Sequence, residues 1–454
     1  MERRTVAVIF VFAFAVCALI TKPHATSWND LSRLAAIDAL ERRHTFAIEG
    51  SPFAAKTQDK YVYAGHTYSD KPPALALQGA AVAAVLEPFG VTLAGAPERS
   101  VYLIVLLSVG FWFALGCVYS YAFQRLLGFA PPGAAFVTAL AALGTLSLPY
   151  ATVLANHVPA GACALAGVYH LARGRRSSAH AALGAVFVAL AYGFDASMVV
   201  LVCAVVVLTW GAPLRTWAVA AAVAAPLVAA QLAYNATVSG AIGPPAMNQA
   251  SWSDPASPFH RASPSLLHFA SPLDYLRYAL YVLVGDKGLF SYTPLTVLCA
   301  LGLARMWKGA ADQRRIALAV VATVMLYVAL VIAFTNDYGS LNYGERRYAD
   351  VFFVLCIGLG PALAVLRGRV WPWLARGAAV ASIALAMLGV VAPFGEHAGD
   401  SGYVFATGEF VRLAHRAPVQ AGIDVLALVL MIFLVLRFWS SAAAPRSGTG
   451  RLAA

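Results

Sequence analysis

Residues 28–73 read WNDLSRLAAIDALERRHTFAIEGSPFAAKTQDKYVYAGHTYSDKPP, a long polar segment in a chain that is otherwise mostly apolar. The segment follows a hydrophobic run at the N-terminus. A polar stretch of this length between apolar runs is where a membrane protein would hold its chemistry, and we interpret it as the first loop on the outer side of a membrane. Its ionisable side chains include Asp30, Arg33, Glu49, Asp59, Lys60, His66, Asp70 and Lys71.

The composition of the whole chain indicates a polytopic membrane protein. Of 454 residues, 60% are hydrophobic and 12% are charged, and the mean hydropathy is +0.72. Soluble domains have about 25% charged residues, and repeated apolar runs of about 20 residues are typical of bilayer spans. The net charge of +11 does not indicate nucleic-acid binding, because most of the excess falls in short loops predicted on one side of the membrane.

We predict about 12 transmembrane helices in an all-α fold. The first is residues 1–22, where Arg3 and Arg4 place the N-terminus in the cytoplasm. This run also resembles a signal peptide, but its retention is favoured because the polar loop needs a membrane tether. The other spans are expected near residues 100–124, 131–151, 157–172, 179–194, 197–212, 215–234, 288–305, 316–334, 349–366, 376–393 and 421–437.

The predicted topology puts basic residues in every cytoplasmic connection, as the positive-inside rule expects. Those residues are Arg125, Arg173, Arg175, Arg176, Arg215, Arg305, Lys308, Arg314, Arg315, Arg367, Arg369, Arg376, Arg437, Arg446 and Arg451. The regions are an outer loop over 23–99, spans 2–7 within 100–234, an outer loop over 235–287, spans 8–12 within 288–438 with outer loops 335–348 and 394–418, and a cytoplasmic tail over 439–454.

Two segments of the first outer loop are predicted as interfacial helices. Residues 74–86 are apolar but short for a hydrocarbon core of about 30 Å, and a crossing there would invert every later loop. Residues 31–42 carry an apolar stripe with Leu34 and Ile37, opposite a charged face that includes Arg33.

Asp30 is the first candidate catalytic residue. It follows the first span by about ten residues, so it is expected at the membrane–water boundary near a phosphate head group. A partly shielded carboxylate there can accept a proton from a hydroxyl group as a general base. The alternative is a structural role, in which Asn29 or Asp30 caps the helix that follows.

Lys71 is the second candidate, in the motif YSDKPP. Proline is well tolerated in the first helical turn, so Pro72 and Pro73 would hold Lys71 rigidly at the membrane face. Its ammonium group could then pair with a lipid phosphate. The alternative is a lysine whose stem lies along apolar surface and whose charge reaches water.

The third signal is NYGERRYAD, which contains Tyr343, Arg346 and Arg347 on the predicted outer side. Two adjacent arginines there run against the positive-inside trend. Guanidinium groups form bidentate hydrogen bonds with phosphate oxygens. Contact with ordinary anionic lipid head groups is the alternative.

Other polar residues at outer span ends include His157, in ANHVPAG, and Asp195. His157 is a candidate for contact with a sugar or phosphate, or else a satisfied core side chain. The six cysteines lie in or beside apolar runs and are expected to be buried. The sequence has no P-loop, GxGxxG, zinc or GxSxG motif, so soluble nucleotide binding has no support.

The arrangement resembles the GT-C superfamily of glycosyltransferases, most closely the branch with protein O-mannosyltransferases and the lipid A aminoarabinose transferase. The resemblance is carried by an aspartate with an arginine three positions on, directly after the first span, and by a loop ending in Asp-Lys-Pro-Pro. The run SRLAAIDALERRHTFAIEG…T.DK…GHTYSDKPP is similar to bacterial members of that branch. GLFSYTP at 288–294 and YGERR at 343–347 are also similar to recurring features of those relatives.

This resemblance implies a polyprenyl-phosphate-linked sugar donor, an outer-side glycan, glycolipid or protein acceptor, and inversion at the anomeric carbon. Asp30 matches the general base and Lys71 the lysine that binds the donor phosphate, assisted by Arg346 and Arg347. Many relatives have a second acidic residue where Leu31 stands, so the second carboxylate and a divalent cation stay open. Further candidates for substrate binding or that carboxylate are Arg33, Glu49, Asp59, His66, Asp70, His157 and Tyr343.

Two other classes were weighed against this one. A multi-span transporter or lipid flippase would carry ionisable residues near the bilayer midplane, whereas here they gather at outer span ends. A non-catalytic scaffold would not need Asp30, Lys71 and Arg346 at one interface. The alanine-rich composition and the loops without cysteine suit a bacterial inner membrane.

Overall fold

A computed structural model describes residues 2–248, 251, 253–258, 269, 271–335, 338, 341–366, 368, 370–395 and 401–439. Part of the predicted topology lies outside these residues: Arg367, Arg369, Arg446, Arg451, tail residues 440–454, and parts of the outer loops 235–287, 335–348 and 394–418.

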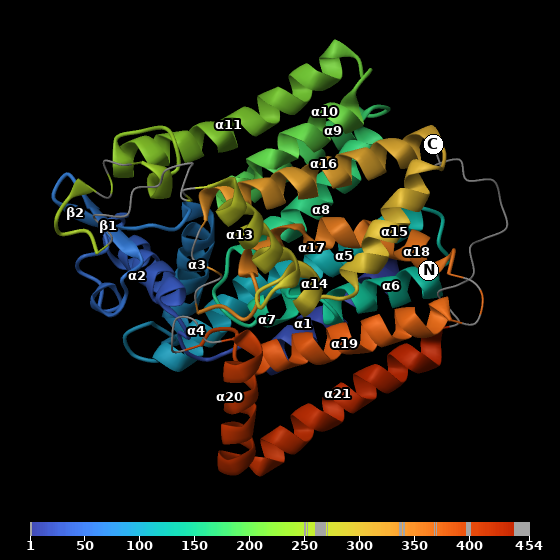
Figure 1. The fold of residues 1–454 in the computed structure, drawn as a ribbon. Helices are drawn as coiled ribbons and strands as arrows, with labels where there is room; N and C mark the ends of the chain where they lie inside the picture. The colour runs from blue at the N-terminus through green and yellow to red at the C-terminus, as the bar shows by residue number, and fades with distance from the viewer. Residues whose placement is uncertain are drawn as a thin grey trace.

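Helices form nearly all of the regular structure in the described residues (Figure 1). They are α1 (Glu2–Ile20), α2 (Trp28–Arg43), α3 (Pro73–Leu86), α4 (Pro97–Val105), α5 (Phe111–Leu126), α6 (Pro131–Leu143), α7 (Ser147–Tyr150), α8 (His157–Gly174), α9 (Ser178–Phe194), α10 (Leu201–Thr209), α11 (Leu214–Ser239), α13 (Pro272–Val284), α14 (Leu289–Tyr292), α15 (Thr296–Trp307), α16 (Ala311–Phe334), α17 (Ala349–Leu355), α18 (Leu359–Leu363), α19 (Trp371–Val391), α20 (Gly402–Arg416) and α21 (Pro418–Phe438).

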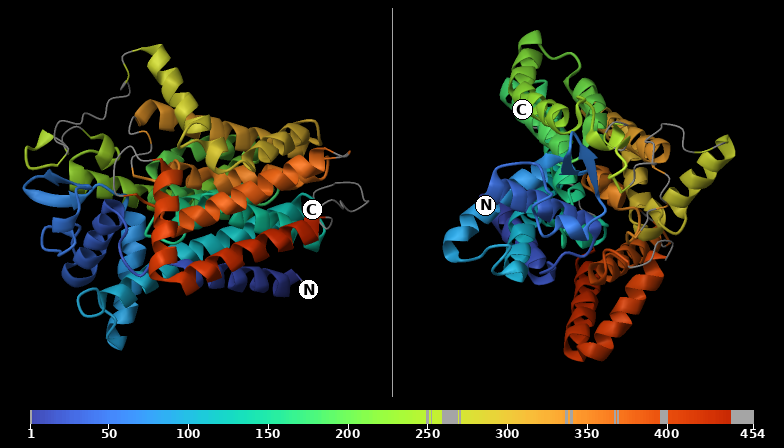
Figure 2. Two further views of the ribbon diagram at one scale, coloured as in Figure 1. Left: turned by 60° about the horizontal axis from the view of Figure 1, so that its bottom comes forward. Right: turned by 90° about the vertical axis from the view of Figure 1, so that its left-hand side faces the viewer.

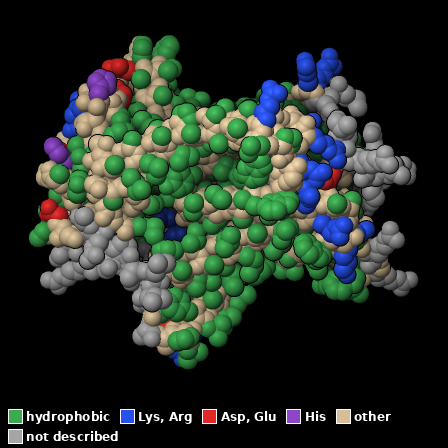
Figure 3. Space-filling model, turned by 90° about the horizontal axis from the view of Figure 1, so that it is seen from above, with side chains coloured by type: hydrophobic (Ala, Val, Ile, Leu, Met, Phe, Trp, Pro, Cys, Tyr) green, Lys and Arg blue, Asp and Glu red, His purple; other side chains and the backbone are tan. Residues whose placement is uncertain are grey.

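The two ends of the helical bundle differ in character. The start of α1 and the end of α21 lie at one end, and α2 lies at the opposite end (Figures 1 and 2). In Figure 3, Lys and Arg side chains gather at the former end, and a broad hydrophobic surface separates them from acidic and His side chains at the other. This distribution is typical of a membrane protein whose basic end faces the cytoplasm.

The chain is a multi-span membrane protein, but 12 single-helix crossings are not shown. Six helices within the described residues are long and apolar enough to cross a bilayer, or seven if α13–α14 and α15, bent by 90°, form one broken span. Each remaining predicted span coincides with a shorter or interrupted helix. For example, residues 131–151 divide at Gly144 into α6 and α7, because glycine and proline weaken a continuous helix.

The helix α2 is buried, which differs from the prediction of a charged outer face. Leu34 and Ile37 are fully buried as predicted, but Arg33 is also buried. Ser27 caps the helix by accepting a hydrogen bond of 3.3 Å from the amide of Asp30. The alternative in which Asn29 or Asp30 caps the helix is therefore not what the structure shows, and Oδ1 of Asp30 has no partner among the described residues.

A short hairpin interrupts the otherwise α-helical chain. Strand β1 (Lys60–Tyr63) pairs antiparallel with β2 (His66–Ser69), and Tyr63 lies opposite His66. Ala64 and Gly65 form the connection with φ of +50° and +81°, as a two-residue hairpin turn requires. The hairpin was missed in the sequence because four-residue strands give little alternation. The hairpin brings Asp59, before β1, close to Lys71, after β2.

The next helix begins where the sequence predicted. Pro73 is at the first position of α3, and α3 packs against α2.

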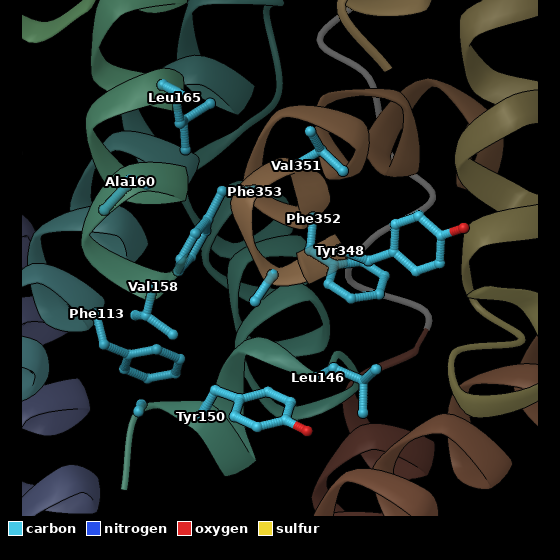
Figure 4. Close-up of a cluster of buried hydrophobic side chains, with 14 of the residues drawn as sticks. Phe113, Leu146, Tyr150, Val158, Ala160, Leu165, Tyr348, Val351, Phe352 and Phe353 are labelled. Atoms are coloured by element: carbon cyan, nitrogen blue, oxygen red, sulfur yellow. The ribbon is translucent and has the colours of Figure 1, made fainter. Parts of the chain in front are cut away.

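The core of the bundle includes a close contact between α8 and α17. A Cβ atom added at Gly161 would lie 2.5 Å from the carbonyl oxygen of Ala349, so only glycine allows this approach. Val158 of α8 and Phe353 of α17 belong to the surrounding apolar cluster (Figure 4). This packing fixes the first turns of the two helices, which carry His157 and Asp350.

Candidate active site

Asp30 lies in the first turn of α2 and is only 2% exposed. Its Oδ2 accepts two hydrogen bonds of 2.8 Å from Thr26, one from the amide and one from the hydroxyl. Its Oδ1 is buried and has no hydrogen-bond partner among the described residues. Burial raises the pKa of Asp30, against the hydrogen bonds from Thr26 and the charges of Arg33 and Arg346. A carboxyl group with a raised pKa and a free oxygen is suited to accept a proton.

Arg33 lies one turn further along α2, and it too is almost completely buried. Its guanidinium donates hydrogen bonds to the side-chain oxygen of Asn156 and, at 3.2 Å, to the carbonyl of Asn29. The Nε–H has no partner in the described part of the chain. Burial and the nearby charge of Arg346 lower the pKa of Arg33 to about 10, so the group stays charged at neutral pH.

Lys71 is held by two carboxylates. Its Nζ lies 2.9 Å from Oδ2 of Asp59 and 2.9 Å from Oδ2 of Asp70. Burial raises the pKa of Asp70 against the opposing charge of Lys71. Burial acts in the same direction on Asp59, but the charge and hydrogen bond of Lys71 outweigh it and lower the pKa of Asp59. The positive charge of Lys71 is therefore already compensated by carboxylates of the protein itself.

Hydrogen bonds attach this part of the loop to α2. The hydroxyl of Ser32 lies 2.6 Å from the carbonyl oxygen of Asp59 and 2.7 Å from the hydroxyl of Ser69. The hydroxyl of Thr57 donates to the carbonyl of Trp28 at 2.9 Å. These bonds hold the two ends of the hairpin against the helix that carries Asp30.

The two adjacent arginines of the third motif have different surroundings. Arg347 forms hydrogen bonds of 3.1 Å with both carboxylate oxygens of Glu345, which is completely buried. Arg346 donates to the side chain of Asn342 at 3.2 Å and lies 5.9 Å from the ring centroid of Phe394. The Nε–H of Arg346 is buried without a partner among the described residues. Arg346 therefore has a buried donor left for a ligand.

Six of the predicted site residues form one electrostatic cluster. The charges of Arg33 and Arg346 each act on both Asp30 and Asp59, and Arg33 also acts on Asp70. The cluster contains three carboxylates and three cations and is formally neutral; its members are Asp30, Asp59, Asp70, Arg33, Lys71 and Arg346.

The remaining predicted residues lie in other surroundings. Glu49 and His66 form an exposed pair, with 2.8 Å between Oε1 and Nδ1. The charge and hydrogen bond of His66 outweigh the effect of burial and lower the pKa of Glu49. Tyr343 is fully buried, and its hydroxyl donates to the carbonyl of Leu385 at 2.8 Å. Glu49 and His66 therefore lie on the exposed surface beside the hairpin, and Tyr343 lies in the core.

His157 belongs to a buried polar network that sequence reasoning did not assemble. Its Nδ1 lies 3.1 Å from Oδ2 of Asp350 and 3.3 Å from Oδ2 of Asp195. The hydroxyl of Tyr327 also donates to Asp350. Asn156 joins this network to the cluster above, because it donates to Asp195 at 2.8 Å and accepts from Arg33. The one sequence signal for Asp350 was an acidic residue at the start of a predicted span.

Comparison with known proteins gave similar structures but no sequence relatives. No protein-family model matches the chain, and no curated protein matches it. The chain is similar over nearly its whole length to solved glycosyltransferases of the GT-C class, which is the class that its sequence motifs resemble.

Three of these structures illustrate the similarity. ArnT from Cupriavidus metallidurans, solved with undecaprenyl phosphate bound, is 15% identical with a TM-score of 0.49, over 97% of this chain and 78% of ArnT. Arabinosyltransferase EmbB from Mycobacterium smegmatis is 12% identical with a TM-score of 0.44, over 99% of this chain and 42% of EmbB. The Archaeoglobus fulgidus oligosaccharyltransferase, solved with a tethered acceptor peptide, is 11% identical with a TM-score of 0.46, over 98% of this chain and 60% of that protein.

Proposed function

We propose that this protein is a membrane glycosyltransferase that moves a sugar from a polyprenyl-phosphate-linked donor to an acceptor on the outer side of the membrane. The acceptor is a cell-envelope glycan, a glycolipid or a protein. In this proposal, Asp30 is the general base, and the donor phosphate binds beside Arg33 and Arg346.

The proposal rests on two incompletely satisfied guanidinium groups whose charges act on Asp30, a carboxylate with a free oxygen. Arg33 and Arg346 each have a buried Nε–H without a partner among the described residues, and the charge of Arg346 lowers the pKa of Arg33. Buried donors without acceptors are costly. A phosphate between them would accept these hydrogen bonds and relieve the repulsion, because guanidinium groups match phosphate geometry.

Lys71 has a different role in this proposal from the one expected at first. Because Asp59 and Asp70 already pair with it at 2.9 Å, it is less able than Arg346 to serve as the main phosphate ligand. We assign Lys71 to holding Asp59 and Asp70 in place. Arg33 takes over the contact with the phosphate, although the sequence motif alone gave that contact to Lys71.

The proposed reaction is a single displacement with inversion. The acceptor oxygen attacks the anomeric carbon, the bond from that carbon to the phosphate oxygen breaks, and its electron pair leaves with the polyprenyl phosphate. The proton of the acceptor hydroxyl moves to Oδ1 of Asp30. Arg33 and Arg346 stabilise the charge on the departing phosphate, and each well-placed donor of this kind is worth about 3 kcal/mol.

The membrane topology of the proposal follows the charge distribution. The end of the bundle with α2, which carries Asp30, is opposite the basic end (Figures 1 and 3). We propose that the site faces the extracytoplasmic side of a bacterial inner membrane, in a topology of twelve crossings with interrupted helices counted as spans. A reporter fused after Phe438 is expected in the cytoplasm.

A direct test is a transfer assay with the full-length protein in liposomes. The substrates are undecaprenyl phosphate carrying radiolabelled mannose, glucose or arabinose, with a cell-envelope extract as the source of acceptors. Release of unglycosylated undecaprenyl phosphate together with labelled acceptor supports the proposal. Movement of an intact labelled lipid across the bilayer would instead identify a flippase, and absence of cleavage with every donor would also overturn the proposal.

A further inference from the structure

Three side chains with metal-ligating atoms meet at neighbouring helix ends, outside the Asp30 cluster. They are His157 at the start of α8, Asp195 directly after α9 and Asp350 in the first turn of α17. Nδ1 of His157 and one oxygen from each carboxylate lie within 4.8 Å of one another. Three ligand atoms from separate elements thus surround one point.

The contacts of Nδ1 of His157 fit a cation shared with the two carboxylates. Its Nδ1 lies 3.1 Å from Asp350 and 3.3 Å from Asp195, but a ring nitrogen carries at most one hydrogen. A charged N–H···O bond is usually about 2.7–2.9 Å long, so both contacts are longer than a good bond of that kind. If the three atoms bind one ion, these Nδ1–Oδ2 distances are explained without one hydrogen being shared between two carboxylates.

The charges of the group also call for a cation. His157 is the one basic side chain that forms an ion pair with Asp195 or Asp350 in the described part of the chain. A protonated imidazole beside two ionised carboxylates leaves one negative charge in a buried place, which is costly unless a proton or a cation compensates it. A divalent cation with a neutral imidazole makes the group neutral.

The surroundings of the two carboxylates resemble an outer coordination shell. Tyr327 donates to Asp350, and Asn156 donates to Asp195 at 2.8 Å. Metal-binding carboxylates are commonly oriented by such hydrogen bonds. Oδ1 of Asp350 is buried without a partner among the described residues, and the Asp350 side chain has no exposed surface. This free oxygen is a further acceptor beside the same point.

We propose that His157, Asp195 and Asp350 bind one divalent transition-metal ion, either Zn²⁺ or Mn²⁺. One imidazole with two carboxylates suits these ions, whereas Mg²⁺ and Ca²⁺ prefer oxygen ligands alone. Three protein ligands leave at least one coordination position for water. The Asp195 side chain is 14% exposed, which gives an ion a route of entry.

The ion would have a positioning role. Asn156 donates to Asp195 and accepts from Arg33, so a fixed Asp195 holds Asn156 and, through it, Arg33. The hydroxyl of Tyr327 lies within hydrogen-bonding distance of Asp350 and, at 2.9 Å, of the carbonyl of Arg347, and its one hydrogen can go to either of them. The site connects both arginine-containing segments of the candidate active site, but the binding of the ion does not depend on the proposed transfer reaction.

The test measures metal content and affinity in the purified full-length protein. After treatment with a chelator, the protein is incubated with Zn²⁺, Mn²⁺, Mg²⁺ or Ca²⁺, separated from free ions and analysed by mass spectrometry of the elements. We expect about one Zn²⁺ or Mn²⁺ per chain, and less than a tenth of that in Asp350→Asn and His157→Ala. His66→Ala is the matched control, since it removes a histidine beside a carboxylate at an exposed position, and it is expected to bind normally.

A further variant keeps the proposal testable if the ligand variants fail to fold. Tyr327→Phe keeps all three ligands and removes one hydrogen bond to Asp350, so it is expected to weaken metal binding about 10- to 100-fold. The proposal is overturned if the wild-type protein binds less than 0.1 ion per chain, or binds Mg²⁺ or Ca²⁺ in preference. Unchanged metal affinity in Tyr327→Phe would remove Tyr327 from the outer shell. Because the readout is metal content, failure here leaves the transfer assay unaffected.

Discussion

The guanidinium of Arg33 donates a hydrogen bond to the side chain of Asn156, which lies 123 residues later in the chain. Arg33 is in α2, within the loop predicted on the outer side, and Asn156 directly precedes α8 in the helical bundle. This bond therefore attaches the helix that carries Asp30 to the bundle. It also connects the two polar groups described above, one around Asp30 and the other around His157.

The first prediction concerns the proposed base. Asp30→Asn keeps the size of the side chain and its ability to accept from Thr26, but it cannot take up a proton. We expect the transfer rate to fall about 10²- to 10⁴-fold, as is typical for loss of a general base. The measurement is the initial rate of transfer in liposomes, with membrane insertion checked by protease protection.

The control for this variant is Asp38→Asn. Asp38 is also a buried acid on α2, but it pairs with Arg42 at 3.5 Å and does not belong to the cluster around Asp30. We expect its transfer rate to stay within a few-fold of the wild type. Full activity of Asp30→Asn, or an equal loss in both variants, would contradict the assignment of Asp30.

The second prediction concerns the pH dependence set by Thr26. The hydroxyl of Thr26 donates to Asp30 at 2.8 Å and opposes the effect of burial, which raises the pKa of Asp30. Thr26→Val removes this bond, so the pKa of Asp30 rises further. Because the base acts only when it is ionised, the acidic limb of the pH–rate profile moves to higher pH. Thr26→Ser keeps the hydroxyl, and its acidic limb is expected to lie where that of the wild type lies. If the acidic limb does not move in Thr26→Val, Thr26 does not influence the pKa of the base.

The third prediction distinguishes the two adjacent arginines. Charged hydrogen bonds contribute about 1.5–3 kcal/mol, so Arg346→Ala is expected to weaken the binding of undecaprenyl phosphate about 10- to 100-fold. The thermal stability of this variant is expected to fall less than that of Arg347→Ala, because the hydrogen bond of 3.2 Å from Arg346 goes to the neutral side chain of Asn342. Binding is measured by titration of a fluorescent undecaprenyl phosphate into protein in detergent.

The fourth prediction is the opposite result for Arg347→Ala. This change leaves the buried carboxylate of Glu345 without its bidentate partner, and loss of one partner of a buried pair costs roughly 3 kcal/mol. We expect a lower melting temperature in a thermal-shift assay. Arg347→Ala combined with Glu345→Gln should recover part of the loss, since the unpaired charge is gone. A stable Arg347→Ala protein with weak lipid binding would reverse the roles of the two arginines.

The fifth prediction tests the contact that brings α8 and α17 together. Gly161→Ala would put a methyl group 2.5 Å from the carbonyl oxygen of Ala349, and overpacking of this kind costs about 1–3 kcal/mol. We expect lower stability and, because His157 and Asp350 move apart, weaker metal binding. Gly377→Ala is the control, since a Cβ there meets no atom within 4 Å, and it is expected to be neutral or slightly stabilising.

Local sequence patterns were sufficient for the main helices and for some of the site. Apolar runs predicted a multi-span helical protein because a bilayer requires each span to satisfy its own backbone hydrogen bonds. The proline pair predicted the start of α3, and the polar loop predicted the neighbourhood of Asp30 and Lys71. The count of single-helix spans did not follow from hydropathy, because Gly144 and other interruptions divide apolar runs that look continuous by composition.

The sequence by itself determined the membrane class and the presence of ionisable groups after the first apolar run, whereas the orientation implied by the basic residues stays a prediction. These features depend on composition and on neighbouring residues. Only the tertiary structure decided which groups meet: Lys71 pairs with Asp59 and Asp70, and Glu345 takes up Arg347 but not Arg346. The physical reason is that a charge's role depends on its burial and its nearest partners, which come from segments far apart in the chain, as Arg33 and Asn156 do.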